Sequence, residues 1–114
     1  MRLAPVLGRL LFILLALAVA GAAQARGNAA SGKAKAAQVC TACHGPDGNK
    51  PSAPDQPVLA GQHYDYLVRA LSDYKAGHRN NGIMKGFAAQ LSKQDIEDLA
   101  AWFASQKSSL HDQR

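Results

Sequence analysis

One short motif constrains this chain more than any other feature. Two cysteines, Cys40 and Cys43, stand two residues apart, and His44 follows directly. This C-x-x-C-H spacing is the attachment signature of c-type haem. The two thiols can each add across one vinyl group of the same porphyrin, and the histidine is then held beneath the macrocycle with a ring nitrogen available to iron. We therefore predict one haem c, with thioether bonds at both cysteines and His44 as the proximal iron ligand.

Three other uses of a cysteine pair fit the chain less well. A disulfide across two residues closes a very small loop, so it would constrain the unfolded chain little. A thioredoxin-like dithiol belongs to a βαβ context, and no strand pattern is present. A four-ligand zinc site of this kind needs a second pair of ligands, whereas the chain has only these two cysteines.

The N-terminus has the anatomy of a secretory signal peptide. A basic start, an apolar run and a small-residue cleavage motif follow one another: Arg2 and Arg9, residues 10–20, and Ala23-Gln24-Ala25. The apolar run is shorter than the roughly 20 residues that span a bilayer. We predict a cleavable signal peptide over residues 1–25 and one domain over residues 26–114, with an uncleaved anchor as the alternative. Because c-type haem is attached outside the cytoplasm, a periplasmic location agrees with the cysteine motif.

The predicted mature chain is one small domain, near the lower size limit for independent stability. Small exported domains usually add disulfides, a metal or another staple, and a covalently bound haem would supply the missing apolar mass. The formal net charge is +5, with Lys and Arg scattered rather than clustered. We therefore expect a solvated surface and no nucleic-acid partner.

Hydrophobic periodicity predicts an all-α fold with three helices, over residues 29–39, 62–76 and 93–107. Gly77 is a natural stop for the second helix, and Ser92 with Asp95 resembles a capping box before the third. The connecting segments are rich in Gly and Pro, and no alternating strand pattern is present. The fold is therefore expected to be helical with long loops.

The haem iron needs a sixth ligand if small molecules are to be excluded. Apart from the initiator there is one methionine, Met84, which we expect in a Gly-rich loop over residues 81–86. A methionine opposite a histidine raises the haem potential. His78 and His63 are the alternatives, and either would give bis-histidine ligation. We predict Met84 as the distal ligand.

With these positions in place, the chain resembles the class I cytochromes c, nearest the bacterial cytochrome c4 and c553 group. The matching stretches run in the family's order through the predicted mature chain: residues 40–48, 57–62, 66–67, 77–80, Met84, 91–92 and 99–103. The resemblance implies a class I cytochrome c fold, with three main helices and loops wrapped around one covalently attached haem. Cytochromes c4 carry two such domains, whereas this chain has one C-x-x-C-H motif, so we expect a single haem.

The resemblance also implies two supporting residues. Pro57 occupies the family's position for a carbonyl that accepts the second ring N–H of His44, a contact that orients a ligating histidine. Gly32 resembles the family's glycine where the first and third helices cross, against Leu99 and Trp102. A glycine inside a helix otherwise costs about 1 kcal/mol relative to Ala, so a packing reason is expected.

The function implied by the resemblance is one-electron transfer, without enzymatic activity. We expect a diffusible carrier between redox proteins: a membrane respiratory complex, a periplasmic oxidoreductase or a terminal oxidase. The alternative is a haem c subunit held permanently by a periplasmic dehydrogenase or reductase. A sensor or peroxidase needs an open iron site, which ligation by Met84 disfavours. No stable membrane insertion is expected after the signal peptide is cleaved.

Overall fold

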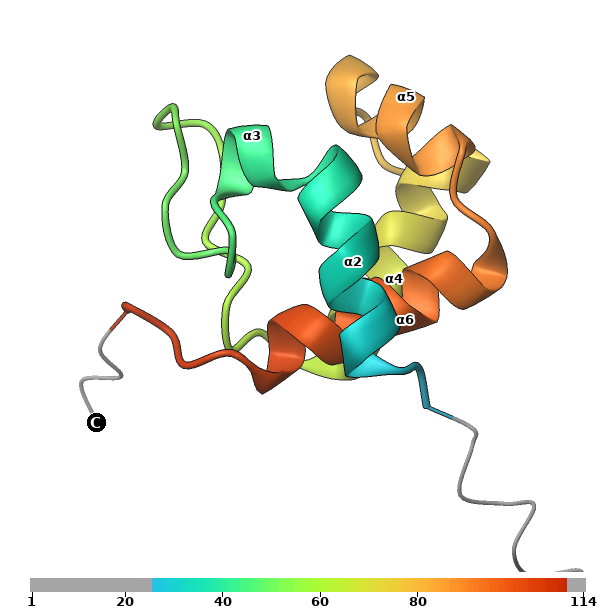
Figure 1. Ribbon diagram of the computed structural model, residues 1–114. Coiled ribbons are helices and arrows are strands. Elements are labelled where there is room, and N and C mark those ends of the chain that lie inside the picture. Colours follow the sequence, from blue (N-terminus) through green and yellow to red (C-terminus); the bar gives the residue numbers. More distant parts are fainter. Residues whose placement is uncertain (1–25, 111–114) are drawn as a thin grey trace, which may run out of the picture.

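The computed structural model describes residues 26–110 of the chain (Figure 1). Within that range the chain forms five helices and no strand: α2 (Ala29–Val39), α3 (Thr41–His44), α4 (Tyr64–Ala76), α5 (Gly82–Ala89) and α6 (Lys93–Ser105). The predicted all-α class is confirmed for these residues. The predicted signal peptide, residues 1–25, lies outside them. None of the helices in the described range is long and apolar enough to cross a membrane.

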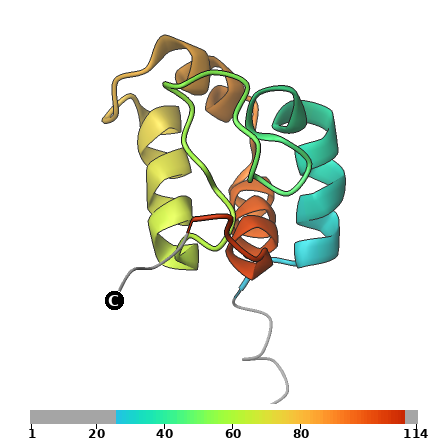
Figure 2. The ribbon, with the colours of Figure 1, turned by 90° about the vertical axis from the view of Figure 1, so that its left-hand side faces the viewer.

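Helix α6 is the centre of the packing. Figure 2 shows α2 and α4 on either side of it, with the loop over residues 45–63 running between them, and α5 packs on α4. The buried face of α6 joins residues from the other helices in one core cluster: Ala36, Leu67, Leu91, Ile96, Leu99, Ala100 and Phe103. Each large apolar side chain buried there contributes about 1.5–3 kcal/mol relative to exposure. The core therefore depends on the apolar stripe that the sequence predicts for the last helix.

Two glycines let α2 and the residues before it approach α6 closely. A Cβ atom at Gly32 would lie 1.9 Å from the Asp98 carbonyl oxygen and 2.9 Å from the Trp102 Cβ. A Cβ atom at Gly27 would lie 2.0 Å from the Glu97 carbonyl oxygen. Any side chain at either position would push the two segments apart. The predicted crossing of Gly32 with the last helix is confirmed at Trp102, with the Asp98 backbone as the nearest contact. Gly27 adds a close approach that sequence reasoning missed.

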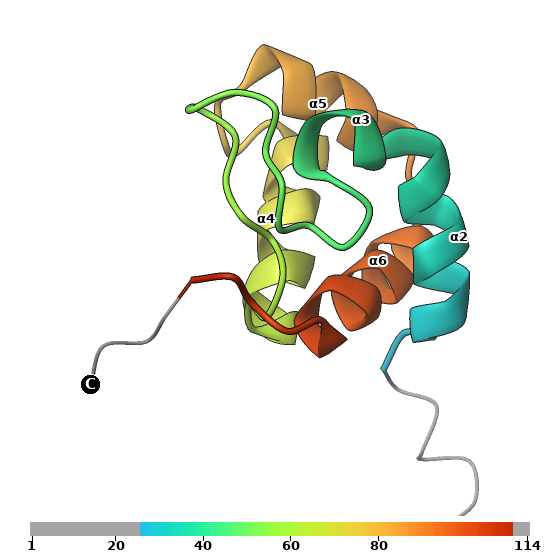
Figure 3. The same cartoon turned by 60° about the vertical axis from the view of Figure 1, so that its left-hand side comes forward.

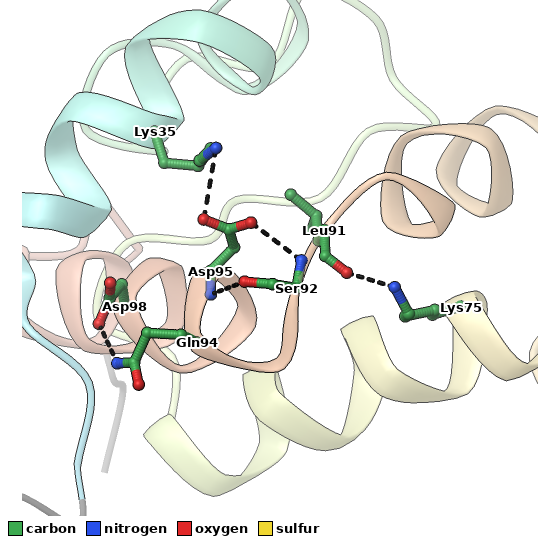
Figure 4. Close-up of polar contacts among 7 residues, drawn as sticks. All are labelled: Lys35, Lys75, Leu91, Ser92, Gln94, Asp95 and Asp98. Carbon is green, nitrogen blue, oxygen red and sulfur yellow. Dashed lines mark hydrogen bonds and ion pairs between the residues drawn. The ribbon is translucent and has the colours of Figure 1, made fainter.

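Polar contacts fix the start of α6 and join it to α2 (Figure 4). The Ser92 hydroxyl accepts from the Asp95 N–H at 3.0 Å, and Asp95 accepts from the Ser92 N–H at 2.9 Å, so the predicted capping box is present. The Ser92 N–H holds the pKa of Asp95 below its ordinary value. Lys35 of α2 lies 3.3 Å from the other Asp95 oxygen. The buried Asp98 accepts from the Asn28 N–H at 2.7 Å, which ties the residues before α2 to α6.

The main departure from prediction concerns the segment that carries Met84. The predicted Gly-rich loop over residues 81–86 is wrong, because Gly82–Ala89 forms the helix α5. The Asn81 side chain caps this helix by accepting from the Met84 N–H at 3.0 Å, and Ala88 is buried. Each glycine lowers helix stability by about 1 kcal/mol relative to Ala. The cap and the packing on α4 outweigh that preference.

The other boundaries differ little from the predictions. Helix α2 has the predicted bounds, α4 begins at Tyr64 rather than at residue 62, and α6 ends at Ser105 rather than at residue 107. The one-turn helix α3 was not expected as a separate element. Gly77 ends α4 as predicted, with a left-handed φ of 82° that favours glycine.

Candidate haem-binding site

A cavity of about 410 Å³ lies between the helices. Cofactor sites in proteins commonly measure roughly 300–1,000 Å³. The lining brings together the attachment motif and Met84, and Figure 3 shows their helices, α3 and α5, at the same end of the domain. Most of the lining from α4 and α6 is apolar: Leu67, Ala70, Leu71, Leu99, Ala100 and Phe103. A largely apolar cofactor that needs sulfur and nitrogen donors fits this lining.

One helical turn presents the attachment motif. Cys40 is the C-cap residue of α2, where its N–H donates to the Ala36 carbonyl at 2.8 Å, and it is also the N-cap residue of α3. The His44 N–H donates to the Cys40 carbonyl at 3.0 Å, so the residues three and four places after Cys40 share a helix face with it. Neither cysteine forms a disulfide in the described range. Burial, with a smaller contribution from Cys43, raises the pKa of Cys40 to about 11.

A backbone carbonyl orients His44. The residue is 6% exposed, and its Nδ1 lies 3.0 Å from the Pro57 carbonyl oxygen. Because a carbonyl oxygen only accepts, Nδ1 carries the proton and donates, which leaves Nε2 with a free lone pair. This is the form in which a histidine ligates a metal. The structure has the Pro57 contact that the resemblance implies, and ligation of iron by His44 stays a prediction.

The loop after α3 brings the Pro57 carbonyl back to the His44 ring. Gly45 makes the reversal with a φ of 84°, a conformation that favours glycine. The Ser52 N–H then donates to the Cys43 carbonyl at 3.0 Å. This bond satisfies a carbonyl that the short helix leaves without an intrahelical partner. The proximal side is therefore fixed by backbone contacts close to the motif.

Among the three candidate distal ligands, Met84 is the one in the lining of the cavity. It is half-buried on α5. His63 is the N-cap residue of α4, and His78 follows the end of that helix. The side chain of His78 is 76% exposed, with its Nδ1 3.9 Å from an Asp73 oxygen. In the described part of the chain, neither histidine lines the cavity. The arrangement favours Met84, whose ligation of iron stays a prediction.

An arginine between two tyrosines also lines the cavity, and sequence reasoning assigned no role to it. Arg79 Nη1 donates to the Tyr66 hydroxyl at 3.3 Å, and its guanidinium lies 4.9 Å from the centre of the Tyr74 ring. The hydrogen bond to Tyr66 raises the pKa of Arg79 above its ordinary value. A guanidinium has five N–H donors, so this cation retains donors for an acidic group at the cavity. The only signal in the sequence was the spacing of Tyr66 and Tyr74 on the second predicted helix.

Comparison with known proteins agrees with this site. Residues 29–107 match the family described as "Cytochrome c". Cytochrome c4 of Pseudomonas aeruginosa is 52% identical over 101 residues, which cover 89% of this chain and 49% of that protein. Cytochrome c-554(548) of Halomonas halodenitrificans is 42% identical over 84 residues, which cover 71% of this chain and 99% of that protein.

A solved structure shares the fold. The crystal structure of reduced recombinant cytochrome c4 from Pseudomonas stutzeri superposes with a TM-score of 0.68 at 47% sequence identity, over 74% of this chain and 48% of that chain. The chain therefore spans about half the length of the cytochromes c4 that it matches. The match to cytochrome c-554(548) covers nearly all of a shorter relative.

Proposed function

This chain belongs to the cytochrome c family, and within it to the c4 group, and we propose that it is an exported monohaem carrier of single electrons rather than an enzyme. Membership of the family implies covalently bound haem c, and the cysteine spacing fits that cofactor. The proposal rests on one observation in particular: the attachment motif and Met84 line the same cavity.

Different residues attach the haem and ligate its iron. Cys40 and Cys43 hold the porphyrin through thioether bonds. His44 offers Nε2, because its Nδ1–H is donated to the Pro57 carbonyl at 3.0 Å. Met84 offers a neutral thioether, which favours the ferrous state relative to a second imidazole. When bound, haem c supplies an iron centre that gains and loses one electron.

Ligation of the iron by two protein side chains also favours electron transfer over catalysis. With His44 and Met84 both engaged, exchangeable small molecules are kept from the metal. The apolar lining from α4 and α6 keeps water from the same space. Around it, Tyr66 is 49% and Phe87 41% exposed, and both line the cavity. A partner can therefore approach the cofactor site at this rim.

We assign the chain to the periplasm, with residues 1–25 as a cleaved signal peptide and residues 26–114 as the haem domain. The basic start and apolar run of the N-terminus support export. The partners we propose are redox proteins, namely a membrane respiratory complex, a periplasmic oxidoreductase or a terminal oxidase. Contacts between such carriers and their partners are small and transient.

The location and cofactor are tested on protein expressed with its full N-terminus in a host that attaches c-type haem. The periplasmic fraction should contain a chain that begins at Arg26 and carries one haem, as measured by intact mass spectrometry. Haem should stay with the denatured protein through extraction with acidified acetone. A mass that includes residues 1–25 would support a membrane anchor, and release of the haem would contradict covalent attachment.

Carriage is tested by stopped-flow mixing of the reduced holoprotein with each candidate redox partner. A diffusible carrier should give an electron-transfer rate that rises linearly with partner concentration. It should also elute as a free small protein after native purification. Recovery in a fixed ratio with one dehydrogenase or reductase would instead support a permanent haem subunit.

A further inference from the structure

Side chains hold both ends of the helix that carries Met84. At the start of α5, Asn81 accepts from the Met84 N–H at 3.0 Å. At the other end, Lys75 of α4 reaches across to the chain that leaves α5. Its Nζ donates to the Ala89 carbonyl at 3.3 Å and to the Leu91 carbonyl, a contact drawn in Figure 4. Ala89 is the last residue of α5, so the lysine joins the end of that helix to α4.

Helix α5 depends on such contacts because, apart from its packing on α4, it is short and has few buried residues. It has 8 residues, whereas isolated helices shorter than about 12–15 residues are marginal in water. Ala88 is its one buried residue, while Ile83 is 68% and Phe87 41% exposed. The last carbonyls of a helix have no intrahelical partner, and a cation near them is favourable for the helix dipole. Lys75 supplies both a donor and a positive charge at that place.

Lys75 differs from the other lysines with assigned contacts. Lys93 pairs with Glu97 of its own helix at 4.0 Å, and its side chain is 93% exposed. Exposed pairs of that kind contribute little to stability. Lys75 contacts no carboxylate among the described ion pairs and instead joins two helices through backbone oxygens. It is absent from the cavity lining, so its effect on the site is indirect, and its two contacts lie at the end of α5.

We propose that Lys75 is a positioning residue for the distal ligand. By holding the end of α5 against α4, it keeps Met84 at the cavity and disfavours the state in which the thioether has left the metal. This inference rests on the proposed function, in which Met84 is that ligand. Loss of the tether should therefore make the distal position easier for another ligand to take, without removing the cofactor.

The test is competition by imidazole in the ferric holoprotein. Met84 ligation is followed by the weak near-infrared sulfur-to-iron charge-transfer band, which disappears as imidazole replaces the thioether. Lys75→Met keeps the length of the side chain and removes its donors. We expect this variant to bind imidazole about tenfold more tightly than wild type, which corresponds to about 1.4 kcal/mol. Lys75→Arg retains donors and charge, and it should restore most of the wild-type affinity.

Two matched variants distinguish loss of the Lys75 contacts from a change of charge and from general destabilisation. Lys93→Met makes the same change of charge at an exposed pair, and it should leave imidazole affinity unchanged. Asn28→Ala removes the cap of α2, where Asn28 accepts from the Ser31 N–H at 2.9 Å. Loss of such a cap weakens folding measurably, but it leaves both ends of α5 intact. This variant should lower the unfolding midpoint without a matching gain in imidazole affinity.

The outcomes are distinct. Equal affinity in Lys75→Met, Lys93→Met and wild type would overturn the role of Lys75 while leaving the proposed function in place. An equal gain in Asn28→Ala would also overturn it, because the effect would then follow overall stability. Absence of the band in the wild-type protein would overturn the role of Met84, and the role of Lys75 with it.

Discussion

The two sides of the candidate site are built in different ways. On the proximal side, His44 is 6% exposed and shares a helical turn with the cysteines, and its Nδ1 lies 3.0 Å from the Pro57 carbonyl oxygen. On the distal side, Met84 lies on a short helix with one buried residue and an Ile83 that is 68% exposed. Proximal groups are set by contacts within the motif and the loop after it. The distal group depends on a cap and on a tether from another helix.

Because of this difference, substitutions on the two sides should have different consequences. A motif on one helical turn keeps its geometry as long as that turn exists. A ligand that depends on tertiary contacts can detach locally, because elements with few buried contacts open at lower free-energy cost than the core. Changes on the proximal side should therefore abolish the holoprotein, whereas changes on the distal side should alter its spectrum and potential while the fold persists.

The largest effect should come from removing both attachment cysteines. In the double variant Cys40→Ala, Cys43→Ala, we expect loss of covalent haem and failure to accumulate folded protein. A small domain without its cofactor lacks much of its core. The measurement is haem staining after denaturing electrophoresis, with circular dichroism of any recovered chain. A stable apoprotein that melts cooperatively would contradict the idea that haem organises this core.

The next effect should come from the distal ligand itself. Met84→Ala should keep covalent haem but open the distal position, giving high-spin character and ready binding of carbon monoxide. Met84→His should keep six-coordination and lower the potential, within the roughly 0.8 V span that axial ligands control. Both variants should lose the sulfur-to-iron charge-transfer band. Absorption spectroscopy and redox titration measure these changes.

A contrary result would reassign the distal side. If Met84→Ala retains the charge-transfer band, Met84 is not the distal ligand. If the wild-type protein shows a bis-imidazole spectrum, then His63 or His78 reaches the metal. That result would require α4 or the segment after it to move, because neither histidine lines the cavity in the structure.

The same contrast explains what the sequence could predict. The proximal site was predictable because Cys40, Cys43 and His44 are neighbours in sequence, and a helical turn converts that spacing directly into a shared face. Helix α2 was predicted with its correct bounds from periodicity. The capping box at Ser92 was equally local.

The parts that sequence reasoning missed depend on contacts between distant segments. Helix α5 contains two glycines, which favour a loop by local propensity, yet the Asn81 cap and packing on α4 make it helical. The close approach at Gly27 involves Glu97, seventy positions further along. The guanidinium of Arg79 contacts Tyr66 and Tyr74 of α4 because the chain turns back toward that helix after its end. None of these contacts has a periodic signature.

A smaller, global effect should follow from the helix crossing, which lies outside both sides of the site. Gly32→Val should destabilise the holoprotein by about 1–3 kcal/mol or more through overpacking, because even a Cβ atom would lie 1.9 Å from the Asp98 carbonyl oxygen. The matched control is Gly86→Ala on α5, where a Cβ atom has no protein neighbour within 4 Å. Denaturant unfolding should show a loss for the first variant only, and the charge-transfer band should persist in both. Unchanged stability in Gly32→Val would contradict the observed crossing.

The smallest effect should come from Pro57, and it tests how the proximal side is held. The group that accepts from His44 Nδ1 is the backbone carbonyl of Pro57, which every residue has. Pro57→Ala should therefore keep the hydrogen bond, the charge-transfer band and the potential. Stability should fall by about 0.4–1 kcal/mol, because the unfolded chain gains conformational freedom when a proline is removed. Pro51→Ala, in the same loop, is the matched control and should show a similar loss. A large fall in potential for Pro57→Ala alone would mean that the rigid ring, and not merely the carbonyl, sets the orientation of His44. The orientation of His44 would then depend on the proline side chain as well as on the backbone. The proximal and distal sides of the site would differ less than proposed.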